Sequence, residues 1–220
     1  LIGVVGLSGS GKSTLLNHLV GEHRSMVSPI AGTTRDAVDS LIDYEGRRFR
    51  FIDTAGIRRK GKTDLKAEKL SVIMARRHLE QSDDAILVID GFESIAAIDA
   101  TIGGYAHEAG RSVIIAVNKW DVVEKSATIT AEYEKRIREK LKFLEYAPIT
   151  FISAKTGQRV QKLYRLIDEV NESRRRRIGT GELNQFLKEV SLARGGLPSD
   201  VKIRYIVQVR VAPPTFIVFT

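Results

Sequence analysis

Nine consecutive residues near the start of the chain, Gly6 to Thr14, have the types and spacing of a phosphate-binding loop. They read GLSGSGKST, directly after the apolar run Leu1–Val5 and directly before the apolar pattern LLNHLV. Glycine lets the backbone bend around an anion, and the N–H groups of the loop and of the helix start then point at phosphate oxygens. Lys12 would bring positive charge to the β- and γ-phosphates. The sequence therefore predicts a site for a nucleoside triphosphate and leaves its base open.

Phosphate binding is assigned to the loop and the first turn of the helix after it, namely Ser8, Gly9, Ser10, Gly11, Lys12, Ser13 and Thr14. Lys12 is also assigned to catalysis, because its charge would stabilise a phosphoryl group during transfer to water. The Ser13 hydroxyl is a predicted Mg²⁺ ligand. The alternative, a glycine-rich turn that binds nothing, fits this combination of residues poorly.

A second motif, Asp53-Thr54-Ala55-Gly56, follows the apolar run Phe49–Ile52, where it would face the phosphate loop. An aspartate there can hold a Mg²⁺-bound water, and the Gly56 N–H can contact the γ-phosphate. We therefore predict Asp53 as a nucleotide and metal ligand and Gly56 as a nucleotide-binding and catalytic residue. By itself the tetrapeptide fits an ordinary turn equally well.

A polar segment with the pair Thr33-Thr34 lies between these two motifs. One threonine would complete the Mg²⁺ shell when the γ-phosphate is present. We favour Thr34 as the metal ligand and catalytic residue, and assign Thr33 to nucleotide binding. The neighbouring Gly32 and polar run favour a loop that orders with triphosphate and relaxes after hydrolysis. A threonine-rich turn without this role is the alternative.

The base is specified by Asn118-Lys119-Trp120-Asp121, which follows the apolar run Val113–Val117. Guanine offers N1–H and N2–H₂ as adjacent donors, and the Asp121 carboxylate can accept both. Adenine has no N1–H donor and would leave that carboxylate unpaired, so discrimination by ~10⁴-fold or more is expected. The Lys119 stem can lie on the purine face, and Asn118 can tie this segment to the phosphate loop. The sequence thus predicts binding of GTP and GDP.

The segment Ser153-Ala154-Lys155 follows the apolar run Ile149–Ile152. We assign all three residues to nucleotide binding, because a backbone N–H there can reach guanine O6. We assign Trp120, in the preceding motif, to packing beside the base.

The elements that must position these motifs alternate between apolar strands and helical patterns. Such an alternation predicts an α/β fold with a mostly parallel, six-stranded sheet covered by helices on both faces. The runs Asp39–Asp43 and Arg48–Ile52 flank a four-residue turn and predict a hairpin, which gives the sheet an antiparallel edge. The segment Glu132–Tyr146 predicts one amphipathic helix.

The 220 residues are 43% apolar and 28% charged, carry a net charge of +8 and include no cysteine. This composition excludes disulfide and thiolate chemistry, and no apolar run approaches the ~20 residues of a membrane span. We expect a cytoplasmic protein with no membrane contact and a polyanionic partner such as RNA. The chain begins inside a predicted strand without a methionine, so we expect a fragment.

The α/β pattern ends near residue 173, and the run Arg174–Arg177 follows it. We predict one domain over 1–173 and a second over 174–220. The second contains an amphipathic helix around Leu183–Val190 and a strand, Val201–Arg210, with one apolar and one largely basic face. The arginine run is either an RNA contact, which we favour, or a hydrated linker.

In order, the motifs are GxxxxGKS, GTTRD, DTAGIRRK, AHEAG, NKWD, SAK and PPTF. This series resembles the translation-factor-related GTPases, specifically their Era-like branch and within it the Der/EngA family of ribosome-assembly GTPases. The resemblance implies a P-loop GTPase fold, here the second of two tandem G domains, followed by part of a small α+β KH-like domain. It further implies hydrolysis of GTP to GDP with Mg²⁺, a switch role in large-subunit maturation, the large subunit and its rRNA as partners, and a monomer.

Two positions depart from the patterns of related GTPases. The family usually has Pro-Asn-Val at positions 8 to 10, and in related potassium-activated members this asparagine helps to hold K⁺. Gly9 lacks that side chain, so we expect no strong activation by K⁺. Ile57 stands where many GTPases carry a water-orienting glutamine, so we expect hydrolysis near ~10⁻⁴ s⁻¹ without ribosomal contacts.

Two alternative functions share these motifs. The first is a nucleotide-gated module that binds rRNA or the ribosome with negligible hydrolysis of its own. The second is an ATP-using kinase or ATPase, since GSGKST occurs there too.

Overall fold

The computed structural model describes residues 1–22, 28–31, 38–52, 64–93, 95–193 and 203–220. The chain divides into two compact units, Leu1–Val170 and Asn171–Thr220, which are described in turn. The domain limits predicted from the sequence, 1–173 and 174–220, stay a prediction. Among the described residues, no helix has the length and apolar character needed to cross a bilayer.

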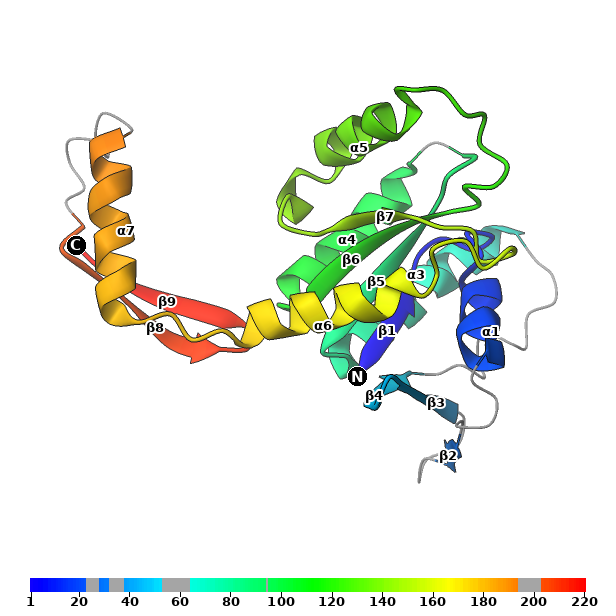
Figure 1. Ribbon diagram of the computed structural model, residues 1–220, viewed down its shortest axis with the longest axis horizontal. Helices are drawn as coiled ribbons and strands as arrows, with labels where there is room; N and C mark the ends of the chain where they lie inside the picture. The colour runs from blue at the N-terminus through cyan, green and yellow to red at the C-terminus, as the bar shows by residue number, and fades with distance from the viewer. Residues whose placement is uncertain (23–27, 32–37, 53–63, 94, 194–202) are drawn as a thin grey trace. The chain divides into compact units, whose positions relative to one another are not determined.

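The first unit is built on a seven-stranded sheet of order β2-β3-β4-β1-β5-β6-β7 (Figure 1). The strands are β1 (Ile2–Val5), β2 (Ser28–Ala31), β3 (Val38–Tyr44), β4 (Arg47–Phe51), β5 (Asp84–Asp90), β6 (Ser112–Asn118) and β7 (Ile149–Phe151). The strands from β4 to β7 in this order run parallel, and β2, β3 and β4 pair antiparallel. The predicted α/β class, the mostly parallel sheet and the hairpin are therefore confirmed.

The structure adds β2 to the six strands expected. Its four residues, Ser28–Ala31, pair with Val38–Leu41 at the outer edge of the sheet. Proline lacks an N–H and is tolerated in a strand at such an edge. Pro29 therefore fits this edge position.

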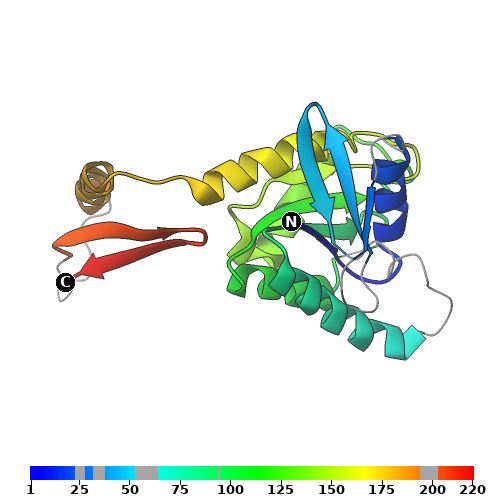
Figure 2. The same ribbon diagram turned by 90° about the horizontal axis from the view of Figure 1, so that it is seen from below.

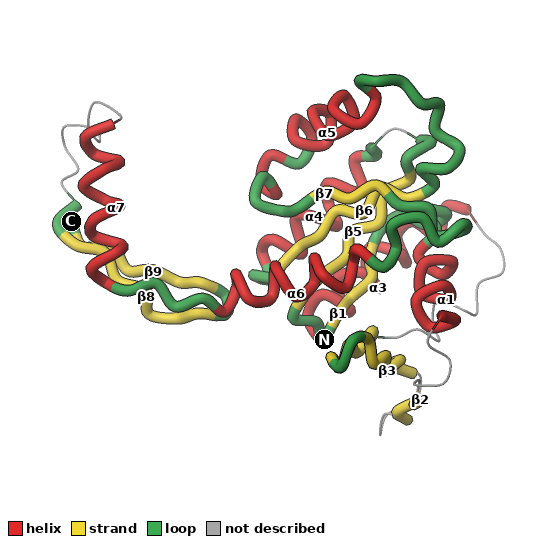
Figure 3. The backbone as a smooth tube through the Cα atoms, in the orientation of Figure 1, coloured by secondary structure: helices red, strands yellow, loops and turns green. Residues whose placement is uncertain are grey.

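Helices cover both faces of the sheet, as expected. They are α1 (Lys12–Glu22), α3 (Asp64–Gln81), α4 (Ala97–Glu108), α5 (Ile129–Lys140), the short 3₁₀ helix η2 (Lys142–Leu144), and α6 (Lys162–Arg175). Side chains alternate along the strands: Ile86 and Val88 of β5 pack with α1 and α6, whereas Leu87 packs with α3, α4 and α5. Figure 2 shows the yellow α6 and the blue-green α3 on opposite sides of the sheet, and Figure 3 shows the helices and strands of the fold by colour.

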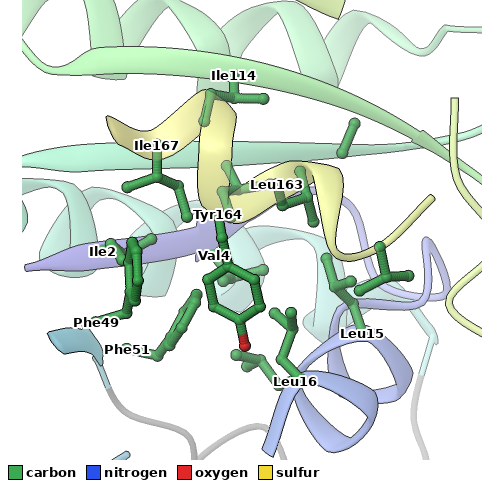
Figure 4. Close-up of a cluster of buried hydrophobic side chains, with 14 of the residues drawn as sticks. Ile2, Val4, Leu15, Leu16, Phe49, Phe51, Ile114, Leu163, Tyr164 and Ile167 are labelled. Atoms are coloured by element: carbon green, nitrogen blue, oxygen red, sulfur yellow. The ribbon is translucent and has the colours of Figure 1, made fainter. Parts of the chain in front are cut away.

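Tyr164 of α6 lies at the centre of the core on the α1 side (Figure 4). Its ring stacks on Tyr44 of β3, with centroids 4.2 Å apart, and lies 4.9 Å from the ring of Phe49 on β4. The side chain is 1% exposed. These ring contacts fix α6 against the hairpin and so hold the antiparallel edge on the parallel sheet.

The helix predicted over Glu132–Tyr146 is shorter in the structure. The α-helix ends at Lys140, because the buried Leu141 adopts φ −116° and ψ 49°, and the chain continues as η2. On this helix Glu132 and Arg136, four residues apart, form an ion pair at 3.9 Å. Arg138 donates to the Leu144 carbonyl at 2.9 Å and so closes this turn.

The second unit consists of α7 (Thr180–Ala193) and a hairpin of β8 (Tyr205–Val211) and β9 (Pro214–Phe219). Gln208 of β8 is 2% exposed, accepts from the Ile178 N–H at 2.7 Å and donates to the Arg176 carbonyl at 3.2 Å. The strand expected over Val201–Arg210 begins at Tyr205 among the described residues, and its burial does not follow the expected faces. Tyr205 and Val209 of the apolar face are exposed, whereas Gln208 of the opposite face is buried. The sequence did not indicate that an amide on the opposite face would be the buried group.

Candidate nucleotide-binding site

The phosphate loop joins the end of β1 to the start of α1. Gly6, Gly9 and Gly11 adopt φ angles of 142°, 90° and 92°, a region that favours glycine. The Leu15 N–H donates to the Gly11 carbonyl at 2.9 Å and so starts the helix at the end of the loop. The Lys12 ammonium donates to the Leu7 carbonyl at 2.6 Å, so this side chain folds back over its own loop.

At two of these glycines, neighbouring atoms also leave no room for a Cβ atom. A Cβ at Gly6 would lie 2.3 Å from the Val88 carbonyl oxygen, and a Cβ at Gly11 would lie 2.2 Å from Nδ2 of Asn118. A Cβ at Gly9 would meet nothing within 4 Å. The loop is therefore shaped by its contacts with β5 and with the end of β6, in addition to any phosphate.

Gly11→Ala is expected to lower the free energy of unfolding by about 3 kcal/mol and to weaken GDP binding, because its methyl group would displace Asn118. Gly9→Ala is the matched control, since its φ is nearly the same but its methyl group has room. That control should cost only about 1 kcal/mol. Denaturant unfolding and calorimetry with GDP measure both effects, and equal losses in the two variants would contradict the role of the Asn118 contact.

Asn118, at the end of β6, connects the phosphate loop to the segment expected near the base. Its Nδ2 donates to the Ser10 carbonyl at 2.8 Å, and its Oδ1 accepts from the Ala154 N–H at 2.8 Å. The side chain is 2% exposed, and the amide uses both its donor and its acceptor ends. This arrangement supplies the tie expected of Asn118 and extends it to the Ser153-Ala154-Lys155 segment.

Asp121 lies exposed on the loop after β6, and its carboxylate accepts a hydrogen bond from the hydroxyl of the fully buried Ser153. This bond is the main reason that the pKa of Asp121 falls below its ordinary value of 3.8, and the charges of Lys155 and Lys125 act in the same direction. Asp121 therefore remains an ionised double acceptor throughout the neutral range, as recognition of adjacent N–H donors requires.

Lys119 has a partner that the motif alone does not indicate. Its ammonium lies 2.5 Å from the carboxylate of Asp90, at the end of β5. The backbone of Lys119 adopts φ 60°. The neighbouring Trp120 is 3% exposed and packs on Tyr133 and Phe151, as its packing assignment anticipated. The order of the strands in the sheet brings Asp90 here, so only a predicted strand order would have revealed it.

Several assigned residues lie outside the described part of the chain, namely Thr33, Thr34, Asp53 and Gly56. Their assignments stay predictions. Of the others, Ser8, Gly9, Thr14 and Lys155 are exposed, and Lys12 and Ser13 are half-buried at the start of α1.

The donor chemistry of the assigned metal ligands suits Mg²⁺. Ser13 and Thr34 offer hydroxyl oxygens and Asp53 a carboxylate, and Mg²⁺ prefers a few protein oxygens together with phosphate and water. Within the described residues, no group of three or more His, Cys, Asp and Glu side chains could hold a metal ion. Of the three assigned metal ligands, Ser13 is the one that lies in the described part of the chain.

Two family models match the chain, each over a different part of it. Residues 1–119 match the model described as 50S ribosome-binding GTPase. Residues 177–220 match the model described as the KH-domain-like region of EngA bacterial GTPase enzymes, C-terminal. The small α+β unit that follows the α/β unit is thus similar to the KH-like domain implied by the sequence.

Among curated proteins, GTPase Der of Lachnospira eligens is 47% identical over 222 residues, which cover 99% of this chain and 50% of that protein. GTPase Der of Bacillus thuringiensis is 48% identical over 220 residues, covering 98% and 50%. The chain therefore spans about half the length of these relatives.

Among solved structures, the crystal structure of Era in complex with MgGDPNP and nucleotides 1506–1542 of 16S ribosomal RNA superimposes with a TM-score of 0.58. It is 28% identical, and the match covers 77% of this chain and 55% of that one. The glycine loop, the Asn118 connection and the ionised Asp121 thus lie within a fold shared with GTPases. This chain belongs to the family of 50S ribosome-binding GTPases.

Proposed function

We propose that this chain binds GTP and GDP with Mg²⁺, hydrolyses GTP to GDP, and so acts as a switch in the biogenesis of the large ribosomal subunit. The observation that carries the proposal is the arrangement at the ends of β1, β6 and β7. Asn118 bonds to both the phosphate loop and the Ala154 segment, and Asp121 is kept ionised beside them. The buried side chain of Asn118 thereby connects the phosphate loop to the segments proposed to bind guanine.

In this proposal the bound nucleotide is divided between two sets of residues. Its phosphates contact the loop and helix start from Ser8 to Thr14, together with Thr33, Asp53 and Gly56. Its base contacts Asn118, Lys119, Asp121 and the segment Ser153–Lys155. The Asp121 carboxylate accepts both guanine donors, which accounts for selection against adenine.

Hydrolysis transfers the γ-phosphoryl group to water. Lys12 would exchange the Leu7 carbonyl for the β- and γ-phosphates and stabilise their developing negative charge. The Gly56 N–H would contact the γ-phosphate. Ser13, Thr34 and Asp53 would hold Mg²⁺, which supplies further positive charge to the phosphate oxygens when it is bound.

The proposed macromolecular partner is the large ribosomal subunit and its rRNA, bound by a cytoplasmic monomer with a net charge of +8. Of the run expected to contact RNA, Arg174 is 8% exposed, and Arg176 pairs with Glu182 at 3.4 Å. Arg175 and Arg177 are exposed. We therefore assign the phosphate contacts to Arg175 and Arg177, and give Arg174 a structural role.

Single-turnover hydrolysis of GTP, measured with and without large-subunit particles, tests the proposed function. We expect slow hydrolysis alone and clear acceleration by the particles. Nucleotide-dependent binding to the particles without acceleration would instead favour the alternative, a nucleotide-gated binding module.

Replacing Arg175 and Arg177 together by alanine is expected to weaken rRNA binding and to reduce the dependence on salt. Each lost phosphate contact lowers the slope of log affinity against log salt by about 0.7 for single strands or 0.9 for a duplex. Lys135 and Lys142, also exposed, give a matched double-alanine control with the same loss of charge. Equal slopes for the two double variants in a filter-binding titration would refute the assignment.

A further inference from the structure

The loop between β6 and α5, residues 119–128, carries Asp121, the proposed acceptor for the guanine base (Figure 1). Its first turn is closed by the Val122 N–H, which donates to the Lys119 carbonyl at 3.2 Å. Asp121 itself is exposed, so packing does little to hold its carboxylate in place. The place of that carboxylate therefore depends on how the neighbouring backbone is fixed.

Trp120, the residue before Asp121, has both of its backbone polar groups bonded. Its N–H donates to the carbonyl of Ile152, directly after β7, at 3.0 Å. Its carbonyl accepts from the ammonium of Lys125, farther along the same loop. The Trp120 side chain is 3% exposed, and its ring lies edge-on to Tyr133 of α5, with centroids 5.1 Å apart. The Trp120 backbone is thus bonded to the end of the sheet by one group and to its own loop by the other.

Lys125 makes two contacts with Trp120, although Lys125 lies on the exposed part of the loop. Besides the hydrogen bond to the Trp120 carbonyl, its ammonium lies 4.4 Å from the centroid of the Trp120 ring. A cation over an indole face is attracted by the ring quadrupole, and indole is the strongest of the aromatic partners. One ammonium therefore closes the loop onto a side chain that is itself buried.

We infer that Lys125 is a positioning residue for guanine recognition, because its ammonium holds the Trp120 carbonyl and ring and so sets the place of the adjacent Asp121 carboxylate. This inference rests on the nucleotide site proposed above. A carboxylate accepts N1–H and N2–H₂ together only when both of its oxygens face the edge of the base. A single hydrogen bond tolerates a small shift of the carboxylate, whereas the pair does not. Loss of the Lys125 contacts should therefore weaken binding most for a base that uses both donors.

Lys125→Met tests the inference, because it keeps the length of the side chain but removes the charge and the donor. Calorimetry compares GDP with inosine diphosphate, whose base keeps N1–H but lacks the N2 amino group. We expect the affinity for GDP to fall about five- to tenfold, as the loss of a hydrogen bond and a cation–π contact to the loop implies. Inosine diphosphate should lose about twofold, so the preference for GDP should shrink about threefold.

Lys125→Arg is the rescue variant, since a guanidinium also donates to carbonyls and stacks on aromatic faces. It should restore the GDP affinity and the preference for GDP to within about twofold of the wild type. Lys140→Met is the matched control, because the Lys140 ammonium also donates to a backbone carbonyl, that of Ile95 at 2.6 Å, but from the end of α5. This control should leave both affinities unchanged.

The emission of Trp120 tests the contact itself without any nucleotide. Trp120 is the single tryptophan of the 220 residues, and a cation over its ring changes the energy of the excited indole. The emission spectrum should therefore change in Lys125→Met and stay as in the wild type in Lys140→Met. An unchanged spectrum in Lys125→Met would overturn the inference, because the contact would then be absent in solution.

Three binding results would also overturn the positioning role. These are equal GDP affinity in the wild type and Lys125→Met, equal losses for GDP and inosine diphosphate, and failure of Lys125→Arg to restore the preference for GDP. Lys125→Leu is the second neutral variant and should repeat the result of Lys125→Met, and failure of both to fold would show a purely structural role instead. A wild type that binds no GDP would refute the proposed nucleotide site while the change in Trp120 emission persists, so the two failures are distinguishable.

Discussion

Asp121→Asn is expected to lower the affinity for GDP by about 10³- to 10⁴-fold, because an amide cannot accept from both N1–H and N2–H₂ of guanine. Its NH₂ group would face the N2–H₂ donor and leave one buried donor of the complex unsatisfied. Since Asp121 is exposed in the chain, the substitution should change the free energy of unfolding little. Calorimetry with GDP on the purified variant measures the loss.

Xanthosine diphosphate is the control ligand for this experiment, because its base carries an oxygen acceptor in place of the guanine N2 amino group. The variant should bind it more tightly than the wild type does. The low pKa of Asp121 also predicts that the wild type keeps this contact between about pH 7 and pH 5, and loses it only below the ordinary value of 3.8. Effective competition by ATP against GDP in the wild type would instead support the second alternative function, an ATP-using kinase or ATPase.

Lys12→Ala is expected to slow single-turnover hydrolysis of bound GTP by about 10²- to 10³-fold. The physical reason is the loss of a charge placed where negative charge develops on the transferred group. In the structure this ammonium contacts the loop backbone at Leu7, so it already lies within the cradle. Rapid-quench measurement with particles present gives the rate at saturating protein.

Lys135→Ala, on the exposed surface of α5, removes the same charge from outside the site and should leave the rate unchanged. If Lys12→Ala weakened GTP binding but left the rate of the bound state intact, Lys12 would be a binding residue only. Its catalytic assignment would then be wrong.

The sequence was sufficient for the parts of the fold that short-range patterns encode. Buried parallel strands appear as apolar runs, and the phosphate loop follows from its glycines, which adopt positive φ angles in the structure. Gly11, the third glycine of that loop, has a further reason, the approach of Asn118, which no local pattern contains. Residues 118 and 11 are neighbours only because β6 and β1 flank β5 in the sheet.

The same limit explains the groups that sequence reasoning missed. Asp90 looks like an ordinary strand-end residue, and its role comes from the ion pair with Lys119, which directly follows the neighbouring strand β6. The early end of α5 depends on the burial of Leu141, and the buried Gln208 depends on two backbone groups about 30 residues away. In each case, contacts between residues far apart in the sequence determine a conformation or an environment that local propensity does not predict.

The two hydrogen bonds of Asn118 have a consequence for how the ligand is recognised. Because the Asn118 amide bonds to both loops, binding of the purine also restrains the phosphate loop. Binding of the phosphates likewise restrains the segment that contacts the purine. The energetic contributions of the two halves of the nucleotide should therefore be non-additive, so that guanosine and pyrophosphate offered separately bind more weakly than their covalent union implies. Replacing Asn118 by a side chain that cannot bond to both loops should make the contributions of the base and of the phosphates to binding more nearly additive.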